Sequence, residues 1–280
     1  MKVLLFLALG YGAIVLLMYG AQTSLIFPGA RLPSRPLDHP FAPERLVIDR
    51  GGGVRLAGML FTPEKGRPSA GLVIGFGGNA QDAEDLGQDL AGTFRRMHVA
   101  VFHYRGYGES TGEPGERALL DDALAIHDHL VEALSPRALH ALGISLGSGV
   151  AGWLSKERSL DGVLLVTPYD SIEAVARQAY PWLPVGLLLK HRFRTLDAMA
   201  GNRTPVAIIA AENDRVIKPA RTEALRQAIE RLVFDRTIKG AGHAEIHGMA
   251  AYQEALLEAL DALNAAAPET LPRSDKGRRD

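Results

Sequence analysis

The sequence predicts an α/β domain with a mostly parallel central sheet, helices on both faces, a small cap insertion and an N-terminal transmembrane helix. Short apolar runs alternate with helical patterns from residue 71 to residue 263, as expected for parallel strands joined by helices. The chain has 280 residues, of which 47% are hydrophobic, so it can form one large domain with a sizeable core.

The N-terminal segment differs from the rest of the chain because no charged residue occurs from position 3 to position 21. Nineteen helical residues at about 1.5 Å each approach the roughly 30 Å thickness of a hydrocarbon core. We therefore expect a membrane anchor over residues 1–21. Lys2 and the α-amine are followed by no charge until Arg31, which favours a domain on the non-cytoplasmic side.

A cleaved signal peptide and a helix buried in a soluble core are the alternatives for this segment. Cleavage after Ala21 would put bulky Tyr19 where a small residue is needed, and the apolar run is long for a signal peptide. A core helix would show a polar face, which this run lacks. An uncleaved anchor is the favoured interpretation.

Proline, glycine and composition divide the rest of the chain. Residues 22–43 contain five prolines and are expected to form an extended stem. The main domain covers residues 44–264 and begins with a hairpin of strands 46–49 and 54–60 around three consecutive glycines. Residues 265–280 carry alanine and proline and then many charges, so we expect a disordered tail.

Strands and helices are expected to alternate along the main domain. The predicted strands are 71–76, 99–104, 138–144, 162–166, 206–210 and 234–238, and the predicted helices are 82–96, 117–133, 148–156, 219–231 and 248–263. Residues 169–204 interrupt this rhythm with two prolines, an apolar run and then a basic stretch. We interpret them as a small cap inserted after a strand.

Composition excludes several classes of function. The net charge is −1 without a long run of one sign, so nothing indicates a nucleic-acid or acidic partner. The chain has no cysteine, which excludes disulfides, thiolate metal sites and cysteine nucleophiles. We expect neither a metal ion nor an organic cofactor.

A G-x-S-x-G motif at residues 143–147 lies where a buried strand should run into a helix. A serine on such a turn is lifted out of the sheet, and the tight turn favours glycine two residues to either side. Ser145 is therefore the candidate nucleophile. The alternative is a glycine-rich turn that contains a serine by chance.

A serine hydroxyl needs a base within hydrogen-bond distance and an acid that orients the base. His243, in a flexible turn between a strand and a helix, is the candidate base. His247, one helical turn later, is the second choice, and His191 lies among arginines in the expected cap, where it is more consistent with a solvated side chain.

The acid should lie between the serine and the histidine in the sequence. Asp214 follows a predicted strand end and is the candidate. Asp170 also follows a strand, but together with Ser171 it has the pattern of a helix cap. Glu212 could substitute, although it lies closer to the strand.

An oxyanion hole requires backbone N–H groups that point at the developing charge. Leu146, directly after the candidate nucleophile, should supply one donor. The glycine-rich loop after the strand 71–76 should supply the other, from Asn79 or alternatively from Gly78. This loop lacks the third glycine of a dinucleotide-binding motif, because Ala80 occupies that position.

Taken together, these motifs resemble the α/β-hydrolase superfamily and, more narrowly, its membrane-anchored, serine-aminopeptidase-like branch. The resemblance covers roughly residues 24–262, and the segment Tyr-Arg-Gly-Tyr-Gly-Glu-Ser-Thr-Gly at 104–112 is its most specific part. Its other parts are residues 25–28 and 77–80, the Ser145 turn, Asn213–Asp214 and Gly242–His243. The resemblance implies an α/β-hydrolase fold.

Two positions depart from the pattern of this branch. Gly77 stands where the branch usually has histidine, which should leave the backbone donor intact. His103 stands where it usually has aspartate, two residues before Arg105, which puts a local charge contact in doubt. We expect Arg105 itself to form a structural ion pair.

The expected function is a serine hydrolase that cleaves an ester or thioester through an acyl-enzyme on Ser145. The apolar cap and the membrane helix favour a small, lipophilic acyl substrate. An exopeptidase is the first alternative, but it would need an acidic cluster to bind a free amine, and Glu173 is the one candidate in the cap to which we give that role. A non-catalytic membrane-anchored scaffold is the second, and its only support is the altered loop at Gly77.

Overall fold

The computed structural model describes residues 1–31, 43–63 and 69–267. The helices are α1 (Lys2–Ile26), α2 (Ala83–Thr93), α3 (Glu116–Leu134), α4 (Leu146–Glu157), α5 (Ile172–Ala179), α6 (Val185–Leu188), α7 (Thr195–Met199), α8 (Pro219–Ala228) and α9 (Ala250–Ala266), with 3-10 turns η1 (Pro28–Arg31) and η2 (Glu245–Gly248). The strands are β1 (Glu44–Asp49), β2 (Arg55–Phe61), β3 (Leu72–Phe76), β4 (His98–Phe102), β5 (Leu139–Ile144), β6 (Gly162–Val166), β7 (Val206–Ala211) and β8 (Leu232–Ile238).

All eight of these strands belong to one sheet, in the order β1-β2-β4-β3-β5-β6-β7-β8. The hairpin β1–β2 and the β2–β4 pair are antiparallel, and every other pairing is parallel. This topology confirms the predicted α/β class. The parallel strands end at one edge of the sheet, where the loops that follow β3, β5, β7 and β8 meet.

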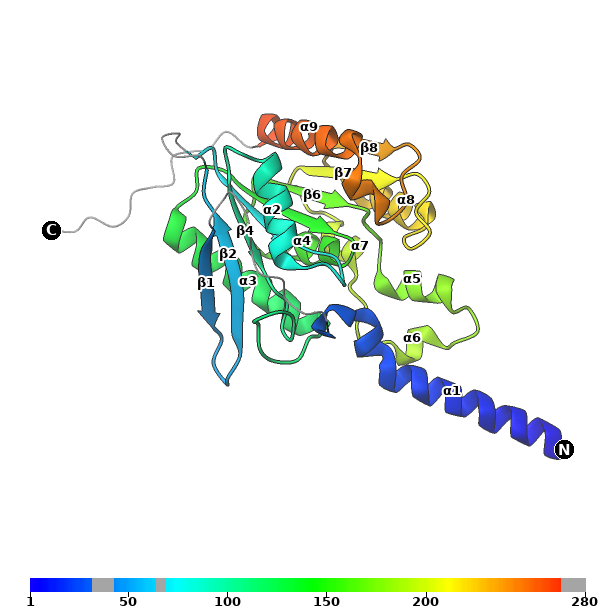
Figure 1. Ribbon diagram of the computed structural model, residues 1–280. Helices are drawn as coiled ribbons and strands as arrows, with labels where there is room; N and C mark the ends of the chain where they lie inside the picture. The colour runs from blue at the N-terminus through cyan, green and yellow to red at the C-terminus, as the bar shows by residue number, and fades with distance from the viewer. Residues whose placement is uncertain (32–42, 64–68, 268–280) are drawn as a thin grey trace.

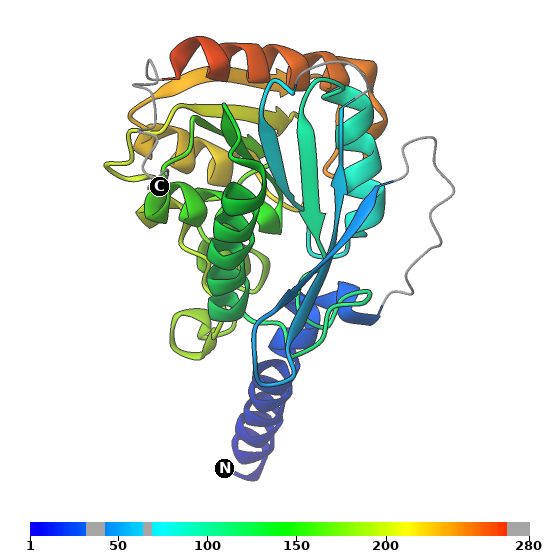
Figure 2. The same ribbon diagram turned by 90° about the vertical axis from the view of Figure 1, so that its left-hand side faces the viewer.

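Helices cover both faces of the sheet (Figures 1 and 2). One core packs α3, α4 and α8 against side chains such as Leu72 and Ile74, and the other packs α2 and α9 against side chains such as Val73. Alternate residues of β3 thus enter opposite cores, as strand geometry requires. Helix α1 projects from the end of the molecule opposite to α9 (Figures 1 and 2).

Helix α1 is longer than the predicted anchor, because it continues to Ile26. The first residues of the expected extended stem are therefore helical. The helix ends at a proline, since the residue before Pro28 is pushed out of the helical region. The rest of the expected stem, residues 32–42, lies outside the described residues.

The predicted cap, residues 169–204, divides into two parts in the structure. Helices α5 and α6 stand away from the sheet beside α1 (Figure 1), whereas α7 packs against α4. Small residues on α4 permit this packing, because Gly152 faces Met199 of α7. At the C-terminus, α9 runs to Ala266, two residues into the expected tail, and residues 268–280 lie outside the described part of the chain.

The turn between β5 and α4 allows no side chain at its two glycines. A Cβ on Gly143 would lie 2.3 Å from the Gly147 carbonyl oxygen, and one on Gly147 would lie 2.1 Å from the Phe76 carbonyl oxygen. Both neighbours are backbone atoms, so neither can move aside cheaply. Gly147 therefore sets how closely the turn approaches the end of β3.

We predict that Gly147→Ala lowers the free energy of unfolding by at least about 3 kcal/mol, because the new methyl group would displace backbone. Gly92→Ala on α2 is the matched control, since nothing lies within 4 Å of a Cβ at that position. It should stabilise the protein by about 0.5–1 kcal/mol through helix propensity. Urea unfolding in detergent measures both, and equal effects would contradict this account of the turn.

Candidate active site

Ser145 occupies a strained turn at the carboxyl end of β5. Its backbone has φ 48° and ψ −114°, a conformation that non-glycine residues rarely adopt. The Ser145 N–H donates to the carbonyl of Val166 at 2.9 Å, and the Ser148 hydroxyl donates to the Ser145 carbonyl at 2.6 Å. These bonds hold the strained backbone, which leaves the Ser145 side chain free to point out of the sheet.

The structure brings Ser145, His243 and Asp214 together in one hydrogen-bonded chain. His243 Nε2 lies 3.0 Å from Ser145 Oγ, and His243 Nδ1 lies 2.7 Å from Asp214 Oδ2. With Nδ1–H donating its hydrogen bond to the carboxylate, Nε2 is left as the acceptor for the serine hydroxyl. This arrangement can remove a proton from Ser145 during nucleophilic attack.

Asp214 is buried and its second oxygen is also engaged. Oδ1 accepts the N–H groups of Val216 at 2.9 Å and Ile217 at 2.7 Å. Three hydrogen bonds therefore fix the carboxylate just after β7, which in turn fixes the ring of His243 in the loop after β8. The sequence carried no sign of the two backbone donors.

The alternative acids and base are occupied elsewhere. Asp170 accepts a hydrogen bond from Arg221 Nη1 at 2.9 Å, and Glu212 accepts a backbone N–H of the loop before His243 at 2.8 Å. His247 packs edge-on against the ring of Tyr252, with its pKa lowered by burial. Among the described residues, none of the three forms a hydrogen bond with the Ser145 hydroxyl.

The glycine loop after β3 presents one free amide beside the serine. Among the described residues, neither Asn79 N–H nor Leu146 N–H has a hydrogen-bond partner, and both residues line the same cavity as Ser145. The Gly78 N–H instead donates to Gln81 Oε1 at 3.0 Å. The alternative donor Gly78 is therefore occupied, whereas Asn79 and Leu146 remain available to an oxyanion.

Two tyrosines of the 104–112 segment hold the glycine loop after β3 in place. We predicted no chemical role for this segment from the sequence. The Tyr104 hydroxyl donates to the Gly77 carbonyl at 2.8 Å, and the Tyr107 hydroxyl donates to the Asn79 carbonyl at 2.7 Å. Burial raises the pKa of Tyr104 well above its ordinary value, so its hydroxyl keeps its proton. With its carbonyls occupied, the loop keeps the Asn79 amide in place.

The turn formed by residues 104–112 itself is held by an ion pair of Arg105 and by the buried ring of His103. Arg105 forms two 2.7 Å hydrogen bonds with Asp122, which confirms the predicted ion pair. His103, where the branch usually has aspartate, is buried with its Nε2 3.9 Å from Glu84 Oε1, and a Cβ on Gly108 would lie 2.6 Å from its ring. The imidazole thus fills the space under the turn.

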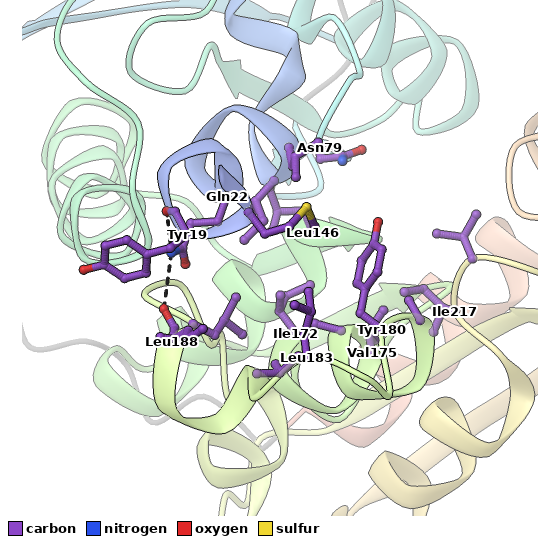
Figure 3. A pocket seen from close by; sticks show the side chains of 18 of the residues that line it. Tyr19, Gln22, Asn79, Leu146, Ile172, Val175, Tyr180, Leu183, Leu188 and Ile217 are labelled. Carbon is purple, nitrogen blue, oxygen red and sulfur yellow. Dashed lines mark hydrogen bonds between the residues drawn. The ribbon is translucent and has the colours of Figure 1, made fainter. Parts of the chain in front are cut away.

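Ser145 opens into an apolar cavity of about 250 Å³ (Figure 3). Helix α5 contributes Ile172 and Val175 to its walls, and the segment after α5 contributes Leu183 and Leu188. The C-terminal half of α1 forms a further wall, with Met18, Tyr19, Gln22, Leu25 and Ile26. Helix α1 is therefore part of the cavity wall. No pattern in the sequence indicates this role.

Polar contacts fasten α1 to the end of α6 and to the residues that follow it. Gln22 is buried, its Nε2 donates to the Leu188 carbonyl at 3.2 Å (Figure 3), and its Oε1 accepts the Lys190 N–H at 2.7 Å. His191 lies 2.9 Å from the Thr23 hydroxyl through Nε2 and is half-buried, so the expectation of a solvated side chain was wrong. Burial lowers its pKa, which keeps the ring neutral.

The end of α1 is fastened to the body of the domain by Phe27. Its ring is fully buried and lies edge-on to His191, at 5.1 Å between ring centroids, and to Phe193, at 6.3 Å. The next residues reach the glycine loop, where the Gly29 N–H donates to the Asn79 carbonyl at 3.2 Å. One short segment thus connects α1 to the candidate oxyanion loop.

Fold and site together define a hydrolase-like α/β protein, and comparison with known proteins agrees. A family profile described as alpha/beta hydrolase fold matches residues 72–190. The chain is 30% identical over 249 residues to the uncharacterized protein Rv2307c of Mycobacterium tuberculosis, covering 87% of this chain and 88% of that protein. The chain belongs to the α/β-hydrolase family.

Two further similarities concern proteins with named activities. The lysophosphatidylserine lipase ABHD12 of Danio rerio is 32% identical over 139 residues, which is 43% of this chain and 36% of that protein. The structure of the esterase Pf2001 of Pyrococcus furiosus superposes with a TM-score of 0.62 at 16% identity, covering 85% of this chain and all of that one. The second similarity shows a shared fold.

We predict that Phe27→Ala lowers the free energy of unfolding by about 3–5 kcal/mol, because it removes a fully buried ring. Phe6→Ala on the exposed part of α1 is the control, and it should change that free energy by less than about 0.5 kcal/mol. Near-ultraviolet circular dichroism during urea unfolding in detergent reports on the domain. Equal effects would show that α1 is not docked through Phe27.

Proposed function

We propose that this protein is a serine hydrolase that cleaves a carboxylic ester or thioester with a lipophilic acyl group. One observation carries the proposal: the chain Asp214–His243–Ser145 ends at the floor of a cavity lined almost entirely by apolar side chains. The name of the lipase relative agrees with the proposal. So does the glycine loop, which carries Gly77 in place of the usual histidine but still presents the Asn79 N–H beside the serine.

In the proposed reaction, Ser145 Oγ attacks the carbonyl carbon while His243 Nε2 accepts the serine proton. The N–H groups of Leu146 and Asn79 stabilise the negative oxygen of the tetrahedral intermediate. As the intermediate collapses, the bond to the leaving group breaks and His243 returns the proton to that group. Water then attacks the acyl-enzyme with the same base, releases the acid and restores Ser145.

The exopeptidase alternative is disfavoured by the state of Glu173. Its carboxylate contacts the guanidinium groups of Arg177 at 2.9 Å, Arg192 at 3.4 Å and Arg194 at 3.7 Å. These contacts lower the pKa of Glu173, the bond to Arg177 most, and leave the group surrounded by positive charge. An ammonium group would be repelled there. The scaffold alternative is disfavoured by the complete hydrogen-bonded chain at Ser145.

We further propose that α1 is a single-pass anchor and that the domain lies on the non-cytoplasmic side. The helix has 25 residues and high hydropathy, and its apolar side chains are exposed along most of its length. Such an exposed apolar surface is unfavourable in water. A bilayer covers it without further protein.

We expect a fluorophosphonate probe to label the wild type and not Ser145→Ala. His243→Ala should slow labelling by about 10⁴-fold, because the serine loses its base, whereas His247→Ala should stay within about threefold of the wild type. In-gel fluorescence of the purified full-length protein measures all four. Labelling of Ser145→Ala, or equal loss in the two histidine variants, would contradict the assignment.

The cavity predicts a preference for acyl chains of intermediate or greater length. Ala176 lines the cavity from α5, so Ala176→Phe should shorten it. We expect kcat/KM for p-nitrophenyl decanoate to fall at least about tenfold while that for the acetate stays within about threefold. Gln178→Phe, on the exposed side of the same helix, is the control. A parallel loss for both esters would place the acyl group elsewhere.

A further inference from the structure

The segment that follows α5 and includes α6 forms an apolar projection, here called the cap tip and defined as residues 180–189. It contains no charged residue, and Arg177 and Lys190 flank it. Three of its large side chains are exposed: Tyr180 by 40%, Trp182 by 51% and Leu187 by 86%. A cluster of this kind on a soluble surface usually marks a contact with a protein or a membrane.

The cap tip lies along α1 and not merely at its end (Figure 1). The Tyr11 hydroxyl donates to the Trp182 carbonyl at 2.9 Å, and Lys190 Nζ lies 4.2 Å from the ring centre of Tyr19. Eight residues of helix separate these two contacts, a distance of about 12 Å. The cap tip therefore extends about 12 Å further toward the N-terminus of α1 than Lys190 does.

The position of the Tyr11 contact matters because few residues of α1 lie between it and the N-terminus. Only residues 2–10 of the helix extend past the Tyr11 contact, and nine residues span about 14 Å, less than half of a hydrocarbon core. If α1 crosses a bilayer, the hydrocarbon must therefore reach well past Tyr11 toward Tyr19. Lys190 beside Tyr19 suits the interface, where lysine and tyrosine side chains place their polar ends in the headgroup layer.

The backbone of the cap tip suits a medium without water. Two of its ten residues are prolines, which have no N–H, and six of the other eight amides donate to backbone carbonyls. Its carbonyls receive donors from outside the segment: Trp182 from Tyr11, Leu188 from Gln22, and Gly186 from Arg192 at 2.8 Å. Each satisfied polar group lowers the free-energy cost of moving this segment out of water.

We propose that the cap tip is immersed in the bilayer leaflet through which α1 enters the membrane, so that the cavity takes acyl chains directly from that leaflet. The cavity runs from Ser145 to Met18 and Tyr19 on α1 and to Leu188 and Leu189 on the cap, which lie on the membrane side. A lipid ester can thus extend its acyl chain along α1 to the serine without exposing it to water. This inference rests on the proposed membrane anchor and deepens the proposed hydrolase.

The chain contains two tryptophans, and these provide the test. Trp182 lies in the cap tip, whereas Trp153 lies on α4 in the body of the domain. Full-length Trp153→Phe and Trp182→Phe are reconstituted into vesicles of phosphatidylcholine with or without bromine on the acyl chains. We expect brominated chains to quench most of the Trp182 emission in Trp153→Phe and to leave the Trp153 emission in Trp182→Phe unchanged.

Flotation of the vesicles separates the two possible failures. Protein that does not float would refute the membrane anchor. Protein that floats with Trp182 unquenched would refute the immersed cap tip, whether water or a second protein covers it, while the anchor stands. Quenching of both tryptophans alike would also refute it, because it would show that the whole domain, and not the cap tip, enters the bilayer.

A second measurement tests the consequence for substrate delivery. Leu187→Asp places a charge on the cap tip outside the cavity, and Leu257→Asp places the same charge at an exposed position of α9. We expect Leu187→Asp to slow labelling by a hexadecyl fluorophosphonate carried in vesicles at least tenfold, with labelling by a short soluble fluorophosphonate unchanged. Equal rates for the two variants with the vesicle probe would overturn the proposal, and no labelling at all would instead contradict the hydrolase.

Discussion

The close approach of the serine turn to the end of β3 is the constraint on which the site depends. Gly147 lies against the Phe76 carbonyl with no room for a side chain, and this brings α4 up to the glycine loop. Ser145, with its left-handed φ, and the Leu146 amide lie on one side of that contact, and the Asn79 amide lies on the other; neither amide has a hydrogen-bond partner among the described residues. The strain at Ser145 is sustained by the surrounding parallel sheet.

The second determinant of the site is the docking of α1. The C-terminal half of α1 forms a wall of the cavity and is fastened by buried Gln22 and Phe27, so α1 does more than the tether we propose for its N-terminal half. The same segment continues to Gly29 and the Asn79 carbonyl, so α1, the cavity wall and the glycine loop form one continuous structure. Helix α1 is therefore part of the cavity in which we propose that the acyl group binds.

Most of the fold could be predicted from the sequence, because strand-helix alternation is a local pattern. The three side chains that meet at the candidate site, Ser145, Asp214 and His243, could also be predicted, because each follows a recognisable strand end. The long-range contacts could not: Gln22 meets Leu188 across 166 positions, and no local pattern reports such a pair. Pro28 did mark the true end of α1, and weighing it would have corrected the anchor boundary. The neighbouring arginines favoured a solvated His191, whereas its partners Thr23 and Phe27 are equally distant in sequence and leave no local sign. The aminopeptidase-like lineage stays a prediction.

The claim that α1 and the cap together enclose the acyl group of a Ser145 adduct can be tested by crosslinking. A long-chain fluorophosphonate with a diazirine at the end of its chain is bound to full-length protein in vesicles, irradiated and mapped by mass spectrometry. The account predicts crosslinks to the C-terminal half of α1, around Met18 and Leu25, and to α5 around Val175. Crosslinks confined to other helices, with α1 unmodified, would contradict it.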